Sequence, residues 1–450
     1  MIKRLIIAGM GSLGESLIYF LQEHYEIIAI DSLSHRVQSL RSQYDIQCIL
    51  GSVLDINLLS TLDLKESCAF ISVTEKDSVN LAACRYVKQQ FPLKFVAARL
   101  KDLDVYLLAK TTSLQESIHL LFNPEYEGIT HALQVLRYPN VMRHISLFEK
   151  KLYGLVVKVE SRHRICGMNL HDIEHHRTLK DTKIIQIFRQ NTLCISPKNL
   201  ILQEGDRVCV VYHSMAGVKR FFDVTMEIPE FLVYFGINSF AYALAKMVSP
   251  HEFKKIFFID EDPVQYEPLA MLYPELSFYK GSPLDKNLWN DLGIQAKKSG
   301  VLALGLKDAD NILAALVHTH AHHVVTMVQN APYLAIGLQM GVKSIIHPNF
   351  LILEHVMTHL SPACIERIYI LTDLLSENQE LTLLVTAELM EDSPILQVRP
   401  IELNAMNIKI IAVLRKSKVL FNPDSVFKED HVVFLCPQSH YTQLLNVLVL

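Results

Sequence analysis

Short apolar runs alternate with amphipathic stretches over the first 140 residues. Residues 4–8, which are apolar after Arg4, and residues 27–30 form two such runs, and the amphipathic stretch 15–22 lies between them. Strands alternating with helices in this way are typical of a parallel sheet covered on both faces. We therefore predict a doubly wound α/β domain, whose remaining strands are 47–50, 68–73, 94–99 and 118–122.

A Gly-x-Gly-x-x-Gly motif, formed by Gly9, Gly11 and Gly14, joins the first predicted strand to the first predicted helix. Gly9 allows a sharp turn, Gly11 leaves room for a phosphate beside the backbone, and Gly14 lets the helix approach the sheet. The start of the helix adds unpaired N–H groups and a partial positive charge. This arrangement predicts a phosphate-binding turn of the Rossmann type.

Asp31 ends the second predicted strand, where a carboxylate can accept hydrogen bonds from a ribose. The same charge would repel a 2′-phosphate, so NAD fits better than NADP. ATP and ADP also have a free 2′-hydroxyl, and Asp31 does not distinguish them from NAD. The alternative is a doubly wound domain that has lost its ligand.

The pattern of the first domain returns later in the chain, after a module of short strands at residues 145–223. Gly236 corresponds to Gly9 and Asp260 to Asp31, in each case about 230 residues further on. We interpret this as a tandem duplication. The predicted domains are a Rossmann-like domain at 1–140, a small α+β lobe at 141–225, a second Rossmann-like domain at 230–365 and a second small lobe at 366–450.

The glycine turn of the second copy has diverged. Residues 236–241 read Gly-Ile-Asn-Ser-Phe-Ala, so Asn238 stands where Gly11 leaves space for a phosphate. The acid is retained as Asp260. Gly236 and Asp260 therefore form a weaker candidate site, and we expect one working nucleotide site per chain.

Composition restricts the partners and the compartment. The net charge of −4 gives no basis for binding nucleic acid or an anionic membrane. The eight cysteines form no Cys-x-x-Cys pair, which favours buried thiols in a reducing cytoplasm. The apolar stretch 231–248 is interrupted by Asn238, Ser239 and Lys246, and we predict a strand and a helix there rather than a membrane span.

Two further patterns suggest chemistry. His318 and His322 are four residues apart on a predicted helix, but no nearby cysteine or carboxylate completes a metal site. Tyr106 and Lys110 have the Tyr-x-x-x-Lys spacing of short-chain dehydrogenases, but the same spacing recurs at Tyr242 and Lys246, in the helix predicted after the diverged turn. No Ser/His/Asp or Cys/His arrangement stands out. We therefore predict neither catalytic nor metal-binding residues.

The duplicated order, the GMGSLG turn, the segment ISVTEKDSVNLAAC at residues 71–84, Asp31 and Arg99 together resemble the TrkA family. These are regulatory subunits of bacterial Trk-type potassium uptake systems, built from two RCK units. The resemblance covers the whole chain. It implies RCK C-terminal lobes for the small modules. It also implies a homo-oligomeric ring beneath a potassium-translocating membrane subunit, and NAD(H) or ATP/ADP as ligand.

The resemblance also implies roles for individual residues. Asp31 would contact the ribose, Val73 and Thr74 the adenosine, and Arg99 a phosphate; an arginine fork suits phosphate oxygens. Val73, Thr74 and Arg99 all follow or end predicted strands. The residues implied at the phosphates are Gly9, Met10, Gly11, Ser12, Leu13 and Gly14.

Other roles stay open for several of these residues. Arg99 could instead form a salt bridge with Asp102 or Asp104. Thr74 and Asn80 could be loop and helix-capping residues. Glu125 could sense a ligand or simply favour a helix start. In the second copy Met327 aligns with Arg99, so the phosphate partner is lost there.

The leading functional hypothesis is a non-enzymatic nucleotide sensor, cytoplasmic and held at the inner face of the membrane by its partner. The alternative from another class is an NAD-dependent oxidoreductase, which would need a general acid or base beside the nicotinamide. A third possibility is a scaffold in which neither copy binds a ligand.

Overall fold

The computed structural model describes residues 2–449 except 63, 66–67, 112–117, 190–191, 195–199, 250, 306, 372–380 and 422. The chain forms two compact units. The first unit contains Met1–Glu127 and Pro348–Ile368, and the second contains Gly128–His347 and Tyr369–Leu450. A segment of the second copy therefore belongs to the same unit as the first Rossmann-like domain.

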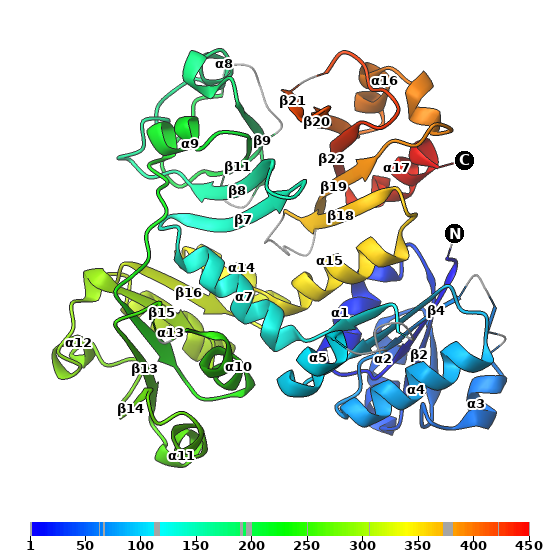
Figure 1. Cartoon of the computed structure of the whole chain (residues 1–450), viewed down its shortest axis with the longest axis horizontal. Coiled ribbons are helices and arrows are strands. Elements are labelled where there is room, and N and C mark those ends of the chain that lie inside the picture. The colour runs from blue at the N-terminus through cyan, green and yellow to red at the C-terminus, as the bar shows by residue number, and fades with distance from the viewer. Residues whose placement is uncertain are drawn as a thin grey trace. The chain divides into compact units, whose positions relative to one another are not determined.

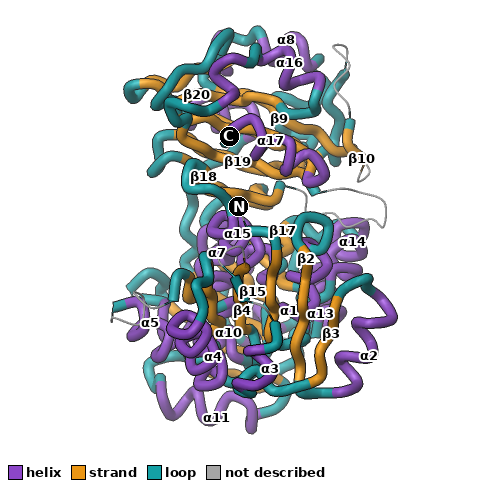
Figure 2. Tube along the Cα trace, turned by 90° about the vertical axis from the view of Figure 1, so that its right-hand side faces the viewer, coloured by secondary structure: helices purple, strands orange, loops and turns teal. Residues whose placement is uncertain are grey.

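The first unit is built around a six-stranded parallel sheet with the order β3-β2-β1-β4-β5-β6. Apart from the edge strand β3, its strands are buried along most of their length, because helices cover both faces. Strands β2 and β3 run side by side in this sheet (Figure 2). The strands are β1 (Arg4–Ala8), β2 (Glu26–Asp31), β3 (Gln47–Leu50), β4 (Cys68–Ser72), β5 (Phe95–Arg99) and β6 (Leu120–Phe122).

The helices between these strands follow the predicted alternation. Two differences concern the glycine turn and the segment after Asp31. The first helix already begins at Ser12, with Gly11 as its N-cap, and residues 34–43 form a helix whose polar sequence gave no periodic signal. The helices are α1 (Ser12–Leu21), α2 (Ser34–Gln43), α3 (Ile56–Ser60), α4 (Asp77–Gln90) and α5 (Leu103–Lys110). Helix α7 (Pro124–Leu136) follows β6, and its residues from Gly128 on belong to the second unit.

Helix α15 (Pro348–Leu360) of the second copy packs on α1 within the first unit. The rings of Phe350 and Phe20 meet edge to face, with centroids 5.1 Å apart. The Asn349 amide donates to Ser16 Oγ at 3.0 Å. The second copy thus supports the helix that begins at the glycine turn of the first copy.

A second six-stranded parallel sheet repeats the topology as β14-β13-β12-β15-β16-β17. The element order of the first half of the chain recurs in the second half (Figure 1). Its elements are β12 (Phe231–Phe235), α10 (Ser239–Met247), β13 (Lys255–Asp260), α11 (Pro263–Leu272), β14 (Ser277–Lys280), α12 (Leu288–Asp291), η2 (Ala296–Lys298), β15 (Ser299–Ala303), α13 (Asp308–Val317), β16 (His323–Met327), α14 (Ala331–Gln339) and β17 (Ser344–Ile346).

Each parallel sheet is followed by a five-stranded antiparallel sheet, with the orders β10-β9-β11-β8-β7 and β18-β19-β22-β20-β21. The first lobe contains β7 (Val141–Leu147), β8 (Leu152–Lys158), α8 (Leu170–Glu174), η1 (Arg177–Leu179), β9 (Thr182–Arg189), β10 (Thr192–Leu193), β11 (Arg207–Tyr212) and α9 (Met215–Phe222). The second contains β18 (Ile365–Ile370), β19 (Thr382–Glu388), η3 (Pro394–Gln397), α16 (Pro400–Ala405), β20 (Lys409–Arg415), β21 (Lys418–Phe421), β22 (His431–Pro437), η4 (Gln438–His440) and α17 (Tyr441–Leu448).

The two antiparallel sheets share one apolar core in the second unit. Ile145 and Leu152 of the first lobe pack in the same buried cluster as Leu384 and Val433 of the second. A buried hydrogen bond of 2.9 Å from Gln186 Nε2 to Thr382 Oγ1 also joins the lobes. The predicted fold class, two tandem Rossmann-like sheets each followed by a small α+β lobe, is confirmed.

The described residues contain no helix that combines the length and the hydropathy needed to cross a membrane. The apolar stretch at residues 231–248 forms strand β12, helix α10 and the turn between them, as its pattern predicts.

Candidate functional site

Gly9 and Gly14 are required by the local fold. Gly9 has a φ of +101°, and a Cβ on it would lie 2.8 Å from the backbone N of Thr74. A Cβ on Gly14 would lie 1.9 Å from the Gly9 carbonyl oxygen. Any side chain at either position would force the turn and helix α1 away from the sheet.

Gly11 has no such internal reason to lack a side chain. Its φ of −77° and ψ of −174° are allowed for any residue. The nearest described heavy atom to a Cβ built on Gly11 is Nη1 of Arg36, at 3.8 Å. The space beside Gly11 therefore opens onto the start of helix α1.

The N-terminus of α1 keeps its backbone donors available. Gly11 is the N-cap, and no described side chain caps this end of the helix. Ser12 and Leu13 form the first turn, and both line the cavity in front of it. Free N–H groups and the helix dipole make such an end a site for anions.

The Asp31 carboxylate is buried and holds two loops. Oδ2 accepts the backbone N–H of Met10 at 2.7 Å, and Oδ1 accepts that of Leu33 at 2.8 Å. The guanidinium of Arg36 lies 3.7 Å from Oδ2. Asp31 therefore fixes the glycine turn and the start of α2, in addition to the ribose contact that the sequence predicts.

Val73 and Thr74 follow strand β4 beside the glycine turn. The Val73 backbone N donates to the Ala8 carbonyl at 2.7 Å. Asn80, which is fully buried, accepts hydrogen bonds from the backbone N and Oγ1 of Thr74 and donates to the carbonyl of Arg99. Asn80 thus ties the ends of β4 and β5 together.

Arg99 lies at the end of β5 and pairs with Glu125 in the first turn of α7, with an Nη2 to Oε1 distance of 3.6 Å. Both side chains are largely buried. The ion pair with Glu125 takes the place of the one that the sequence suggested with Asp102, whose carboxylate caps α5 and accepts the N–H of Asp104.

A cavity of about 610 Å³ lies at this edge of the sheet. Two residues predicted at the site, Met10 and Gly14, do not line this cavity. Met10 donates its backbone N–H to Asp31, and Gly14 allows helix α1 to lie close to the glycine turn. The predicted residues that line it are Gly9, Gly11, Ser12, Leu13, Asp31, Val73, Thr74 and Arg99.

The cavity also includes four charged side chains that sequence reasoning missed, namely Arg36, Glu75, Lys76 and Lys101. Each follows a strand by a few residues. The carboxyl ends of parallel strands meet at one edge, so a search of the segments after β2, β4 and β5 would have found them.

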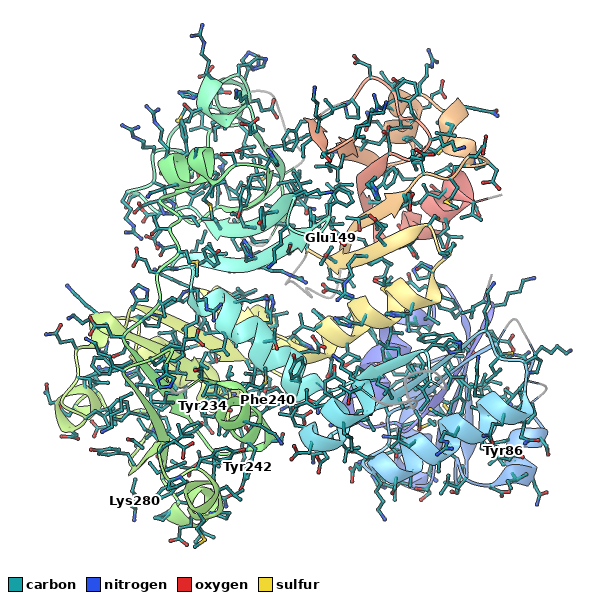
Figure 3. The ribbon with its side chains drawn as sticks, in the orientation of Figure 1. Tyr86, Glu149, Tyr234, Phe240, Tyr242 and Lys280 are labelled. Carbon is teal, nitrogen blue, oxygen red and sulfur yellow. The ribbon has the colours of Figure 1, made fainter. Side chains whose placement is uncertain are left out.

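The second copy closes the corresponding turn with its own side chain. The side-chain oxygen Oδ1 of Asn238 accepts the backbone N–H of Phe240 and of Ala241, at 3.0 and 3.3 Å. The Asn238 amide donates to the Leu304 carbonyl, and the Tyr234 hydroxyl donates to Asn238. Tyr234 and Phe240 mark this region in Figure 3. The donors that are free in α1 are therefore partly satisfied in α10.

Asp260 keeps the scaffold bonds of Asp31. Its carboxylate accepts the backbone N–H of Ile237 at 2.8 Å and of Asp262 at 2.9 Å. Met327 is buried at the end of β16, where the first copy has Arg99. Gly236 retains the left-handed φ, +77°.

The histidine run is not a helical metal motif. Helix α13 ends at Val317, so His318 and His322 do not share a helix face. His318 is buried, and its Nε2 lies 2.7 Å from the Pro283 carbonyl oxygen. Burial lowers the His318 pKa. Among the described residues no group of three metal-ligating side chains comes together.

Tyr106 is buried away from the cavity. Its hydroxyl donates to Glu127 at 3.4 Å, and Lys110 Nζ lies 4.4 Å from the centre of its ring. Burial raises the Tyr106 pKa well above its usual value. These contacts make Tyr106 and Lys110 part of the packing between α5 and α7.

Comparisons with known proteins agree with this architecture. The curated protein "Trk system potassium uptake protein TrkA" of Vibrio alginolyticus is 23% identical over 461 residues, which cover 97% of this chain and 96% of that protein. The protein of the same name from Haemophilus influenzae is 23% identical over 443 residues, covering 96% and 95%.

Two solved structures share the fold. "Crystal Structure of the GsuK RCK domain" matches with a TM-score of 0.58 and 13% identity, over 99% of this chain and 95% of that chain. "GsuK channel bound to NAD" matches with a TM-score of 0.58 and 14% identity, over 99% and 79%. The family model described as the TrkA-N domain matches residues 5–119 and 232–348, just over half of the chain. The resemblance stated from the sequence is confirmed, and the chain belongs to the TrkA-N domain family.

Proposed function

We propose that the chain is a regulatory subunit of a potassium-transport system and binds NAD(H) or ATP/ADP at the cavity of the first copy. The two curated relatives are potassium uptake proteins by name, and they match almost the whole chain. One structural neighbour is a channel described as bound to NAD. The bound nucleotide would favour one conformation and so bias the transport protein.

The observation that carries the nucleotide proposal is the open N-terminus of α1. Neither the backbone conformation nor the packing of Gly11 explains why it lacks a side chain. A phosphate that approaches the backbone does explain it. The cavity volume of about 610 Å³ lies within the range of small-molecule sites.

The residues present fit an adenine nucleotide. The backbone N–H groups of Ser12 and Leu13 and the guanidinium of Arg99 would hold phosphate oxygens. Asp31 has further lone pairs for ribose hydroxyls and would disfavour a 2′-phosphate. Val73 and Thr74 would lie beside the adenosine. Gly236 and Asp260 would hold no nucleotide, because Asn238 takes the place of the phosphate.

We propose a non-enzymatic role. A hydride-transfer enzyme needs a general acid or base near the nicotinamide, most often a histidine. The described cavity lining contains no histidine, cysteine or tyrosine. Mixing the purified protein with NADH and candidate oxidants tests this point, and turnover above background would contradict it.

The assembly is also part of the proposal. The chain would form a homo-oligomeric ring on the cytoplasmic side of the membrane, attached through a Trk-type potassium-translocating subunit. The antiparallel modules at 141–225 and 366–450 would be the RCK C-terminal lobes of the two units. Co-purification of the full chain with a co-expressed Trk-type membrane subunit tests this attachment, and recovery of the chain alone under mild conditions would argue against it.

A thermal-shift titration with NADH, NAD, ATP and ADP tests the nucleotide site. Gly11→Asn copies the second copy's residue into the first, and its Cβ meets no described atom closer than 3.8 Å. We expect wild type to gain stability with at least one ligand. Gly11→Asn should keep its melting temperature without ligand and lose the shift. Absence of any shift in wild type would remove the basis of the proposal.

A further inference from the structure

Arg36 extends across the cavity of the first copy. It lies in the first turn of α2, whose start is fixed by the hydrogen bond from Leu33 N to Asp31 Oδ1. Its Nη1 is 3.7 Å from Asp31 Oδ2, and its Nη2 is 3.3 Å from Oε1 of Glu75, in the segment after β4. The guanidinium therefore bridges the segments that follow β2 and β4.

This bridge passes next to the proposed phosphate position. Arg36 Nη1 is the nearest described heavy atom to a Cβ built on Gly11. The Glu75 side chain is 79% exposed, while that of Arg36 is 30% exposed. The carboxylate is therefore the more solvated member of the pair, and an exposed ion pair of this kind is weak.

A comparison of the two copies distinguishes residues that the fold requires from residues that serve another purpose. Asp31 and Asp260 make equivalent backbone hydrogen bonds, so the fold requires both. Asn80 and Asn311 likewise each donate to the last carbonyl of the neighbouring strand, at 3.0 Å. These residues are unchanged between copies because their bonds hold the sheet edge together.

The residues around the bridge are replaced together in the second copy. Gln265 occupies the position of Arg36, and its amide turns back to Asp262 of its own helix at 3.5 Å. By sequence, Leu306 stands where the first copy has Glu75. Arg36 and Glu75 are thus lost in the copy that also lost Gly11, although both copies keep the same fold.

We propose that Arg36 is a phosphate-binding residue and that Glu75 occupies it when no nucleotide is bound. The inference rests on the proposed function. It adds that the nucleotide phosphate replaces the Glu75 carboxylate as the partner of the Arg36 guanidinium. Glu75 is accordingly a competitor of the ligand. A charged hydrogen bond from Arg36 to phosphate is stronger than its exposed pair with Glu75.

The experiment measures the dissociation constants of ADP and NADH by calorimetry on the full chain at fixed salt. Arg36→Ala should weaken binding about 10- to 100-fold, and Arg36→Lys should weaken it less. Glu75→Gln should strengthen binding about 2- to 5-fold, since the competing charge is removed. A gain of affinity does not result from misfolding, so this arm is independent of protein stability.

The double variant Arg36→Ala/Glu75→Gln tests the coupling between the two residues. The gain from Glu75→Gln should disappear in it, because Glu75 then has no guanidinium to occupy. Glu23→Gln and Arg85→Ala, which alter exposed charges outside the cavity lining, should leave both constants unchanged. A gain that persists without Arg36, or that Glu23→Gln reproduces, would show a general charge effect and overturn the inference.

Competition by inorganic pyrophosphate identifies which part of the ligand Arg36 contacts. Pyrophosphate should displace ADP from wild type and do so less effectively from Arg36→Ala. An unchanged pyrophosphate constant together with weaker ADP binding would place Arg36 on the base and overturn the inference. Failure of wild type to bind ADP and NADH would refute the proposed function itself. Normal wild-type binding with unaltered variants would refute only the role of Arg36.

Discussion

Asp31 has a structural role that does not depend on any ligand. Its carboxylate binds two backbone N–H groups, and Asp260 does the same in the copy whose turn is closed by Asn238. The presence of an acid at this position is therefore no proof of a working ribose site. A better indicator of ligand binding is Gly11, whose missing side chain serves no contact within the protein.

Paired substitutions at the two acids separate these roles. Asp31→Asn and Asp260→Asn should each destabilise their unit by about 1–3 kcal/mol, since a charged acceptor of two backbone N–H groups is weakened. Only Asp31→Asn should also reduce the thermal shift caused by ADP or NADH. Chemical denaturation with and without ligand provides both values. Equal loss of the ligand shift in the two variants would contradict the assignment of a single site.

The sequence predicts these residues unevenly. Gly9, Gly11, Gly14 and Asp31 stand out because their spacing follows from the geometry of a strand, a turn and a helix. Arg36 does not, because it lies in a mostly polar helix that shows no apolar periodicity. The pairing of Arg99 with Glu125 also escapes prediction, since it joins side chains from different elements across the end of the sheet.

At the scale of elements, α15 is the least expected feature. Local patterns are compatible with a helix after Pro348, since proline suits a first helical turn. They do not reveal its packing partner, because that partner lies far away in the sequence. In the structure α15 packs on α1 of the other copy, through Phe350 and Asn349.

Phe350→Ala should therefore weaken the helix that carries the glycine turn. The Phe350 ring is 5% exposed, and its loss should cost about 3–5 kcal/mol. Hydrogen exchange should become faster in α1 and α15 and stay unchanged in α10. Phe427→Ala, at a ring that is 53% exposed, serves as the control and should change stability by less than about 1 kcal/mol. Faster exchange confined to α15 would argue that α1 does not depend on this contact.

At the scale of the whole molecule, buried histidines should make the chain sensitive to acid. Burial lowers the pKa of His323 to about 3 and that of His347 to about 4. In the unfolded chain both would titrate near their usual value of 6.5. Between these values the unfolded state binds more protons than the folded state, so stability falls as the pH decreases from about 7 toward 4.

The first copy suggests the variant that tests this effect. Asn123 occupies the position of His347 and pairs its amide with the backbone of Lys101 and Tyr126. His347→Asn should flatten the loss of stability between about pH 6 and pH 4.5 by up to about 1.4 kcal/mol per pH unit. Urea unfolding across this range measures the slope. An unchanged slope would mean that His347 is not neutral in the folded protein.

If the first copy binds nucleotide as proposed, Asn238 should make the two halves of the chain respond differently when nucleotide becomes scarce. Its side chain permanently completes the second turn, whereas the proposed ligand completes the first one only while it is bound. We therefore expect proteases to cut within residues 1–127 first, and saturating ADP or NADH to slow that cleavage by mass action. Cuts within residues 230–347 should be indifferent to nucleotide. The supply of nucleotide would then set how long the subunit survives, as well as the conformation it adopts.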